Sequence, residues 1–335
     1  MRCTVYHVAS VPSISQLAEG IQSSDRASIG RAITLVESYR PDHRALSQEL
    51  LTQLLPFAGK AHRVGITGVP GVGKSTFIEN LGTKLVKDDH KVAVLAVDPS
   101  SSRTGGSILG DKTRMATLVN HPAAFIRPSP TSGELGGVNR MTRETMLICE
   151  AAGFDVILVE TVGVGQSETV VADMVDFFLV LMLHGAGDEL QGIKKGILEL
   201  ADMVAINKAD GENAQKAAVA AKEYEMALHL MAPTSDLWTA PVVTCAGLTG
   251  EGISELWAKI ISHKNIFSEA GATMLKREEQ RVRWMWAMLD DRLVDALRSH
   301  ERVRELLPVL EAQVRTEQTT PVAAVDHLIN TFLEN

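Results

Sequence analysis

Short apolar runs and longer amphipathic segments alternate along the chain from about residue 63 to residue 261. Most of the short runs are continuously apolar rather than interrupted by polar residues, which is typical of strands buried on both faces. Such strands occur in mostly parallel sheets that helices cover on both sides. We therefore predict an α/β fold with strands at Val64–Thr67, Val92–Val97, Ala124–Ile126, Val156–Glu160, Phe178–Met182, Val204–Asn207 and Val242–Thr244.

Apolar residues at helical spacing mark the region before this alternation. Residues 13–56 are expected to be helical, with one helix over Ala27–Tyr39 and another over His43–Leu55. Pro41 separates the two helices, and Ser24 or Asp25 is the expected N-cap of the first.

The composition changes after about residue 267, where charged residues, Met and Trp become frequent. We predict three helices there, over Glu269–His300, Glu301–Arg315 and Pro321–Leu333. The apolar stripe of the first helix is formed by Val282, Met285 or Trp286, Leu289, Leu293 and Leu297. This stripe fits either packing against the preceding domain or a dimerisation arm. The expected parts of the chain are residues 1–60, 61–265 and 266–335.

Composition and charge narrow the class of protein. The chain has 335 residues, 45% hydrophobic and only 4% aromatic, so aliphatic residues and Met must fill a sizeable core. A net charge of −8 argues against nonspecific nucleic-acid or anionic-membrane binding as the main role. The widely spaced Cys3, Cys149 and Cys245 indicate neither a disulfide framework nor a zinc site. Because no run is apolar enough to span a membrane and no secretory signal is evident, we expect a cytoplasmic protein.

One glycine-rich segment between a predicted strand and a predicted helix carries specific chemistry. It reads G-V-P-G-V-G-K-S and fits the phosphate-loop pattern G-x-x-x-x-G-K-[ST]. Backbone N–H groups and the positive end of a helix dipole can surround a polyphosphate there, although an ordinary strand-to-helix turn is the alternative. Lys74 is expected to reach the terminal phosphates, and the Ser75 hydroxyl to bind Mg²⁺. The loop residues are Gly68, Val69, Pro70, Gly71, Val72, Gly73, Lys74 and Ser75.

Acidic residues lie where such a loop would need a metal ion. Glu160 ends one apolar run, and Gly163 follows it in an E-x-x-G arrangement. A carboxylate at this point can orient Mg²⁺, and the Gly163 N–H can sense the terminal phosphate. Asp98, at the end of another run, and Asp111 are further metal candidates, because Mg²⁺ prefers oxygen ligands. Each of these acids has the alternative role of a helix cap or a surface charge.

The nucleotide base has its own candidate readers in the N-K-A-D sequence of residues 207–210. The Asp210 carboxylate can accept hydrogen bonds from N1–H and the 2-amino group of guanine, and adenine offers neither in that arrangement. Asn207 is expected to contact the base edge, and the Lys208 stem to cover the ring face. Ala246 lies in a stretch that resembles the S-A-[KL] element of GTPases, whose backbone N–H binds the guanine oxygen.

Two further segments bear on the rate of turnover. Val164 follows Gly163 where the small signalling GTPases carry a water-positioning Gln, and the role of the nearby Gln166 is open. We therefore predict slow intrinsic hydrolysis that a partner accelerates. Gly185–Gly196 holds four glycines and dense charge. It is either a surface loop leading into a helix or a mobile third switch that contacts a partner.

With these motifs in order, the chain resembles the MeaB-type GTPases, which also carry the older label ArgK or lysine/arginine/ornithine transport ATPase. The resemblance extends to about residue 265 and is most specific in D-P-S-S-S-R-T-G-G-S-I-L-G-D-K-T-R and E-T-V-G-V-G-Q-S-E. The C-terminal helices match mainly in character. The matching stretches are Ala27–Ser38, Val64–Ser75, Val92–Arg114, Phe125–Gly137, Glu150–Glu168 and Asp188–Lys208.

The resemblance implies a P-loop GTPase core with an N-terminal helical extension and a C-terminal dimerisation arm. It also implies hydrolysis of GTP to GDP and phosphate with Mg²⁺. The implied role is that of a homodimeric chaperone of adenosylcobalamin-dependent methylmalonyl-CoA mutase, which gates cofactor delivery and protects or reactivates the mutase. By the family pattern, Thr76 joins the phosphate-binding residues and Gly185–Gly196 matches a third switch. Cobalamin itself need not bind this chain, which lacks the D-x-H-x-x-G pattern.

Other functions stay open from the sequence. A metallocentre-insertion GTPase of the nickel-maturation type would share the phosphate loop, but the ten His are scattered rather than clustered. A kinase or ATPase linked to amino-acid transport would prefer ATP, against which Asn207–Asp210 argues. A scaffold that binds nucleotide without turnover is the third alternative. Methylmalonyl-, ethylmalonyl- and isobutyryl-type mutases are equally possible clients.

Overall fold

The computed structural model describes residues 13–38, 40–97, 115–128, 135–161, 167–185, 195–231 and 235–334. The chain divides into two compact units, Met1–Arg277 and Glu278–Asn335. Asp98, Asp111, Gly163 and Gln166 of the sequence analysis lie outside the described residues, as does most of Gly185–Gly196. The part boundaries expected at residues 60 and 265 stay predictions.

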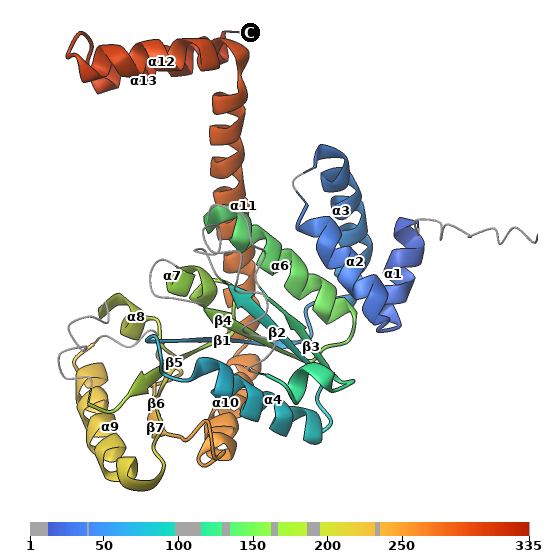
Figure 1. Cartoon of the computed structure of the whole chain (residues 1–335), viewed down its shortest axis with the longest axis vertical. Helices are drawn as coiled ribbons and strands as arrows, with labels where there is room; N and C mark the ends of the chain where they lie inside the picture. The colour runs from blue at the N-terminus through green and yellow to red at the C-terminus, as the bar shows by residue number, and fades with distance from the viewer. Residues whose placement is uncertain are drawn as a thin grey trace, which may run out of the picture. The chain divides into compact units, whose positions relative to one another are not determined.

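The first unit is built on a parallel sheet (Figure 1). Its strands are β1 (His62–Gly68), β2 (Val92–Val97), β3 (Ala124–Arg127), β4 (Val156–Thr161), β5 (Phe177–Leu183), β6 (Met203–Asn207) and β7 (Val242–Thr244). Within the described residues the strand order is β3-β2-β4-β1-β5-β6-β7, and every neighbouring pair is parallel. The predicted α/β fold and all the predicted strands are thus confirmed, with small shifts at the strand ends.

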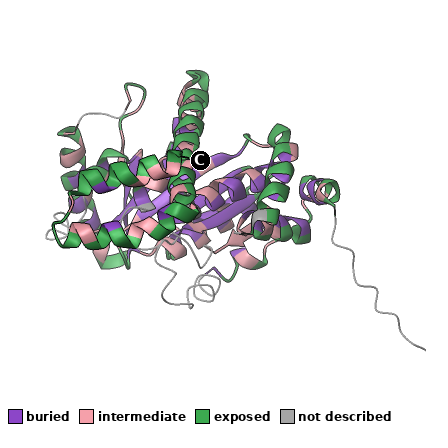
Figure 2. Cartoon of the chain, turned by 90° about the horizontal axis from the view of Figure 1, so that it is seen from above, coloured by how far each residue is buried: buried purple, intermediate pink, exposed green. Residues whose placement is uncertain are grey.

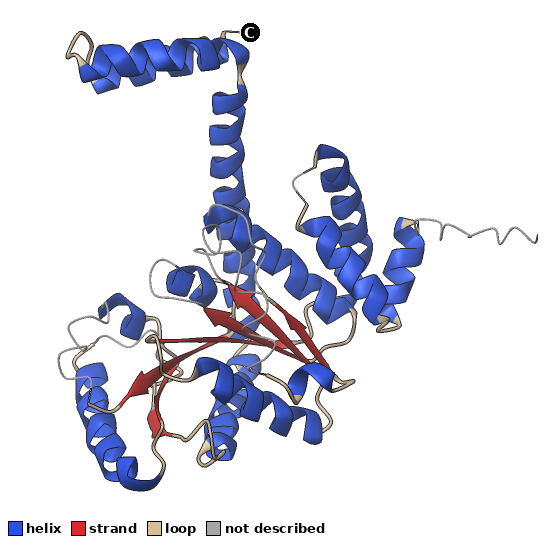
Figure 3. Ribbon diagram, viewed as in Figure 1, coloured by secondary structure: helices blue, strands red, loops and turns tan. Residues whose placement is uncertain are grey.

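Helices cover both faces of this sheet, which explains the continuous apolar runs. In β4, Leu158 packs into one core and its neighbour Val159 into the other. The central strands are accordingly buried, whereas β3 and β7 at the two edges of the sheet are less so and the outer sides of the helices are exposed (Figure 2). One face is covered by α4 (Lys74–Lys87) and α10 (Ile253–Glu269), and the other by α6 (Leu135–Ala151), α7 (Ser167–Ala172) and α9 (Ala214–His229) (Figure 3). The short elements are η1 (Leu55–Phe57), η3 (Leu118–Asn120), α8 (Lys195–Glu199) and η4 (Gly211–Asn213).

The N-terminal residues form α1 (Ile14–Gln22), α2 (Arg26–Val36) and α3 (Pro41–Leu54). Asp25, one of the two expected caps, accepts hydrogen bonds from the first backbone N–H groups of α2. Ile29 and Ile33 of α2 are fully buried in the core that also contains α6. The predicted helical extension therefore packs as part of the first unit.

The C-terminal residues form α11 (Ala272–Ser299), α12 (Glu301–Arg315) and α13 (Pro321–Leu333). The last two have their predicted bounds. The helix predicted from Glu269 was wrong at its start, because α10 ends there and Gly271, with φ of +70°, separates it from α11. In the second unit α12 packs against α13, and Val303 and Leu310 are buried. No helix among the described residues is long and apolar enough to cross a membrane.

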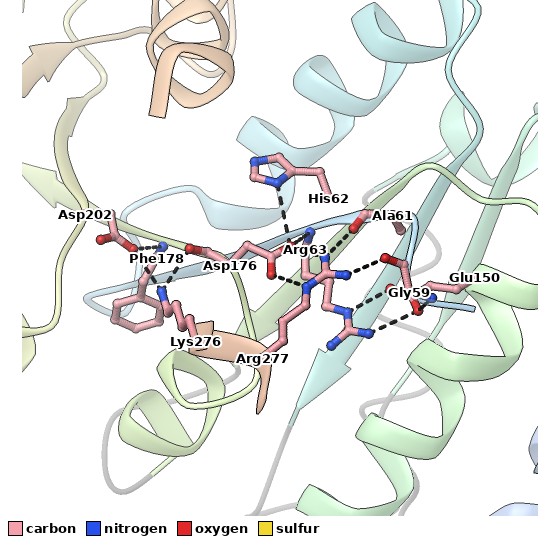
Figure 4. Close-up of polar contacts among 10 residues, drawn as sticks. All are labelled: Gly59, Ala61, His62, Arg63, Glu150, Asp176, Phe178, Asp202, Lys276 and Arg277. Atoms are coloured by element: carbon pink, nitrogen blue, oxygen red, sulfur yellow. Dashed lines mark hydrogen bonds and ion pairs between the residues drawn. The ribbon is translucent and has the colours of Figure 1, made fainter. Parts of the chain in front are cut away.

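A buried ionic network lies where β1 and β5 begin (Figure 4). Asp176, which directly precedes β5, accepts hydrogen bonds from Arg277 Nε at 2.7 Å and Nη2 at 2.6 Å, and from the Arg63 backbone N–H at 2.8 Å. Arg277 also donates to the carbonyl oxygens of Gly59 and Ala61, both at 2.6 Å. The start of α11 is thereby tied to the first residues of the sheet.

Two further basic residues extend this network. Arg63 forms a bidentate pair with Glu150 of α6, at 2.8 and 3.0 Å. Lys276 donates to the Asp176 carbonyl oxygen at 2.9 Å, and its Nζ lies 3.8 Å from an Asp202 carboxylate oxygen. The amino ends of the strands, α6 and α11 are therefore joined by charge-assisted hydrogen bonds. This end of the sheet lies opposite the predicted phosphate loop.

Asp176 is held ionised by its partners. Burial alone would raise the pKa of this carboxyl, but hydrogen bonds from Arg277 and His62 and the charge of Arg277 hold the pKa well below its usual range. A group whose pKa is lower in the folded state stabilises the fold above its unfolded pKa, about 3.9 for Asp. We therefore expect this stabilisation to be complete near neutral pH and to be lost progressively as the pH falls below about 4.

Replacing Asp176 with Asn is expected to lower the free energy of unfolding by about 3 kcal/mol, because the largely buried guanidinium of Arg277 loses its charge partner. Urea unfolding followed by circular dichroism measures the change. Asp42→Asn, which breaks an exposed pair with Arg40, is the matched control and is expected to leave the midpoint nearly unchanged. Equal midpoints for Asp176→Asn and the unsubstituted protein would contradict the stabilising role of the network.

Candidate functional site

The phosphate loop lies between the carboxyl end of β1 and the first turn of α4. Gly68 ends β1, and a Cβ there would lie 2.3 Å from the Leu181 carbonyl oxygen of β5. Gly73 is the N-cap of α4, in the left-handed conformation with φ of +94°. A larger residue would strain the loop at both positions. The structure therefore gives the glycines of the pattern a physical reason and places the loop at a helix N-terminus, where anions bind.

Lys74 points back across this loop. Its Nζ donates a hydrogen bond to the Gly68 carbonyl oxygen at 2.7 Å. Partial burial lowers the pKa of Lys74, whereas the carboxylates of Glu160 and Glu168 act in the opposite direction. The hydrogen bond to Gly68 holds the ammonium group at the opening of the loop, where it can contact a phosphate.

Ser75 and Glu160 are brought together at the other side of the loop. The Ser75 hydroxyl donates to Glu160 Oε1 at 3.3 Å, and Glu160 is buried at the end of β4. A hydroxyl and a carboxylate are hard oxygen donors of the kind that Mg²⁺ takes. Among the residues that the structure describes, no group of three or more His, Cys, Asp or Glu side chains could hold a metal. The roles of Asp98, Asp111 and Gly163, which lie outside those residues, stay predictions.

Asn207 joins the predicted base site to the phosphate loop. This buried residue ends β6, and its Nδ2 donates to the Val72 carbonyl oxygen at 2.8 Å. Its Oδ1 accepts the backbone N–H of Gly247, also at 2.8 Å. Lys208 has a left-handed φ of +60°, and its Nζ donates to the Gly71 carbonyl oxygen at 2.8 Å. Residues widely separated in the sequence therefore form one site at the carboxyl ends of the strands.

The loop that holds Ala246 completes this side. The Ala246 N–H donates to the Glu251 carbonyl oxygen at 2.9 Å, and the Gly250 N–H donates to the Ala246 carbonyl oxygen at 2.8 Å. To bind the guanine oxygen, the Ala246 N–H would have to exchange the first of these bonds for the base. The base-reading roles of Ala246 and Asp210 stay predictions, as does the phosphate-binding role of Thr76. Cys245 is buried, and its burial raises the pKa of the thiol to about 12, so it does not ionise near neutral pH.

Comparison with known proteins agrees with this arrangement. Residues 29–302 match the family described as methylmalonyl-CoA mutase-associated GTPase MeaB. A putative GTPase of Caulobacter vibrioides is 56% identical over 319 residues, which cover 95% of this chain and 98% of the relative.

Two further proteins extend the comparison to animals and to solved structures. The mouse protein named methylmalonic aciduria type A homolog, mitochondrial, is 44% identical, over 95% of this chain and 79% of its own length. The crystal structure of a LAO/AO transport system kinase superposes with a TM-score of 0.77 at 38% identity and covers 96% of this chain and 98% of the other. The fold is that of a P-loop GTPase, and the chain is a GTPase that belongs to the MeaB family.

Proposed function

We propose that this GTPase serves an adenosylcobalamin-dependent acyl-CoA mutase, with methylmalonyl-CoA mutase as the first candidate. In this proposal it gates delivery of the cofactor and protects or reactivates the mutase. The observation that carries the proposal is the match of residues 29–302 to a family described as mutase-associated. The name of the mouse relative, which refers to methylmalonic aciduria, points to the same metabolism.

The phosphate loop is proposed to hold the triphosphate of GTP, and GDP after hydrolysis. The N–H groups of Gly71, Gly73 and Thr76 would face phosphate oxygens, and Lys74 would exchange the Gly68 carbonyl oxygen for the terminal phosphates. Because phosphoryl transfer is catalysed mainly by positioning and electrostatics, Lys74 would stabilise charge that spreads over the transferred group.

Mg²⁺ is proposed to bind between Ser75 and Glu160, with Asp98 and Asp111 as further candidate ligands. The 3.3 Å separation between Ser75 Oγ and Glu160 Oε1 supports this placement, because one ion can lie near two such oxygens. When bound, the ion would neutralise charge on the phosphate oxygens. We expect Glu160→Gln to raise the Mg²⁺ concentration that gives the half-maximal rate by about tenfold. A Mg²⁺ dependence equal to that of the unsubstituted protein would remove Glu160 from the metal site.

The base is proposed to bind between the ends of β6 and β7. Asp210 would accept the two guanine hydrogen bonds, and the Lys208 stem would cover the ring. Asn207, predicted to contact the base edge, would also support both loops through its bonds to Val72 and Gly247. The N–H of Ala246 would approach the guanine oxygen. Preference for GTP over ATP follows from the carboxylate, which adenine would leave unpaired.

Slow intrinsic hydrolysis with acceleration by the partner is part of the proposal. Gly163 would sense the terminal phosphate, and Val164 offers no side chain that could orient water. Gly185–Gly196 would act as a third switch toward the mutase.

A homodimer is also proposed, formed through the helices of the second unit. Of the stripe identified in the sequence, Val282, Met285, Trp286, Leu289 and Leu293 are exposed in the single chain, and Leu297 is half-buried. Exposed large apolar residues at helical spacing favour an interface with a second copy. Sedimentation should give twice the chain mass of 36.2 kDa, and a monomer at micromolar concentration would contradict the dimer.

Association with the mutase can be tested by size-exclusion chromatography of the mixed proteins. The proposal predicts co-elution with methylmalonyl-CoA mutase in the presence of GDP or a non-hydrolysable GTP analogue. A related acyl-CoA mutase from the same cell is the second client to test, and an unrelated protein of similar mass is the control. Separate elution from every such mutase, whatever the nucleotide, would contradict the proposed partner.

A further inference from the structure

Asn80 connects α4 to the loop of the proposed base site. It lies in the same helix as Lys74 and Ser75. Its Nδ2 donates to the Gly247 carbonyl oxygen at 2.6 Å and approaches the Leu248 carbonyl oxygen at 3.3 Å. Because both partners are acceptors, the NH₂ side of the Asn80 amide must face the loop.

A second side-chain amide, that of Asn207, is hydrogen-bonded to the same loop residue, Gly247. The Gly247 N–H donates to Asn207 Oδ1, and Asn207 Nδ2 donates to the Val72 carbonyl oxygen of the phosphate loop. Gly247 therefore has its N–H held by Asn207 and its carbonyl oxygen held by Asn80. A continuous path of hydrogen bonds runs from the phosphate loop through Asn207 and Gly247 to α4, which itself begins at the phosphate loop.

Close packing explains why the loop needs this support. A Cβ at Gly247 would lie 3.1 Å from Phe77 Cα, so the loop backbone rests directly on α4. Because Gly247 has no side chain, this part of the loop cannot be anchored by side-chain packing of its own. Besides the backbone hydrogen bonds of Ala246 with Glu251 and Gly250, the side-chain amides of Asn80 and Asn207 hold the loop in position.

We propose that Asn80 is a positioning residue that holds residues 246–250 against α4 and thereby sets how long guanine nucleotide stays bound. The inference rests on the proposed base site and goes beyond it, because Asn80 touches neither base nor phosphate in that scheme. Loss of Asn80 releases the base loop but leaves the phosphate loop, Lys74 and Ser75 in place. Nucleotide release then accelerates while the chemical step is unchanged.

The test compares Asn80→Ala with Asn80→Asp, and uses Lys84→Ala as the control. Aspartate has the shape of asparagine but presents only acceptors to the two carbonyl oxygens. Lys84 lies on the same helix and pairs with Asp88 at the surface. If Asn80 acts only by filling space, the Asp variant will behave like the unsubstituted protein. If Asn80 acts as a donor, the Asp variant will be at least as impaired as the Ala variant.

Release of a fluorescent GDP analogue measures the expected effect. We expect dissociation to be about tenfold faster for Asn80→Ala, at least as fast for Asn80→Asp, and unchanged for Lys84→Ala. The single-turnover rate of hydrolysis at saturating GTP should change by less than about twofold, since the phosphate contacts are retained. Thermal unfolding without nucleotide checks that each variant folds. Release at the unsubstituted rate from either Asn80 variant would overturn the inference.

Base analogues separate failure of this inference from failure of the base site itself. The diphosphate of 6-thioguanosine keeps N1–H and the 2-amino group but carries sulfur, a weaker acceptor, in place of the 6-oxygen, whereas IDP lacks only the 2-amino group. Asn80→Ala should reduce the advantage of GDP over the first analogue and keep its advantage over IDP, which depends on Asp210. If the unsubstituted protein does not distinguish GDP from these analogues, the proposed base site fails. If it does distinguish them and Asn80→Ala keeps both ratios, only the Asn80 inference fails.

Discussion

Replacing Lys74 with alanine is expected to reduce kcat/KM for GTP by about 10³-fold. The ammonium group lies at the mouth of the phosphate loop, with its Nζ 2.7 Å from the Gly68 carbonyl oxygen. Alanine removes the positive charge that would meet the terminal phosphates, and no other side chain of the loop carries one. The loss should appear mainly in kcat, since Lys74 is expected to stabilise the charge of the transition state.

Phosphate release at saturating GTP measures this loss. Lys84→Ala removes a lysine from the exposed side of the same helix and should retain full activity. The Lys74 variant should unfold at a temperature close to that of the unsubstituted protein, because partial burial disfavours the charged form of Lys74. Retention of more than about a tenth of the activity would contradict the central role of Lys74 in the site.

Changing Asp210 to Asn is expected to switch the preferred nucleotide from GTP to XTP. Guanine presents two donors, N1–H and the 2-amino group, whereas xanthine presents N1–H and an oxygen at C2. The carboxamide of Asn can accept from N1–H and donate to that oxygen. Because a site built for specific hydrogen bonds rejects a mismatched base strongly, we expect kcat/KM for GTP to fall by about 10³-fold and XTP to become the better substrate.

Glu212→Gln is the matched control for this change. Glu212 is exposed in the turn directly after Asp210, so its substitution should leave the preference for GTP intact. Activity of the Asp210 variant with XTP would also show that it folds. If Asp210→Asn hydrolyses GTP as before, another residue must read the base.

The sheet could be predicted from the sequence because its strands are buried on both faces. Most strands are therefore largely apolar runs, and β4, buried throughout from Val156 to Thr161, shows this directly. The polar residues Glu160 and Asn207 stood out because they end such runs, and parallel topology brings the ends of strands together. The phosphate loop could likewise be predicted, because its backbone requires glycine at fixed positions and these glycines form a recognisable motif.

The contacts that join distant segments could not be predicted in this way. Nothing in the sequence distinguishes Asn80 from other polar residues of α4, since its function depends on a loop 167 residues further along the chain. Arg277 likewise looks like one charge among many in a charged helix, yet it pairs with Asp176, which lies 101 residues earlier. Its role appears only once the fold removes both groups from water. The break at Gly271 was missed because the charged segments on both sides have helical composition.

Phosphate release from GTP and from ATP, with and without methylmalonyl-CoA mutase from the same cell, separates a mutase-associated GTPase from its alternatives. We predict slow release from GTP that rises several-fold with the mutase, and no release from ATP. Release from GTP that no acyl-CoA mutase alters would contradict the proposed client and favour another, including a metalloenzyme. Preferential hydrolysis of ATP would contradict the proposed reading of guanine by Asp210 and favour a transport-linked kinase.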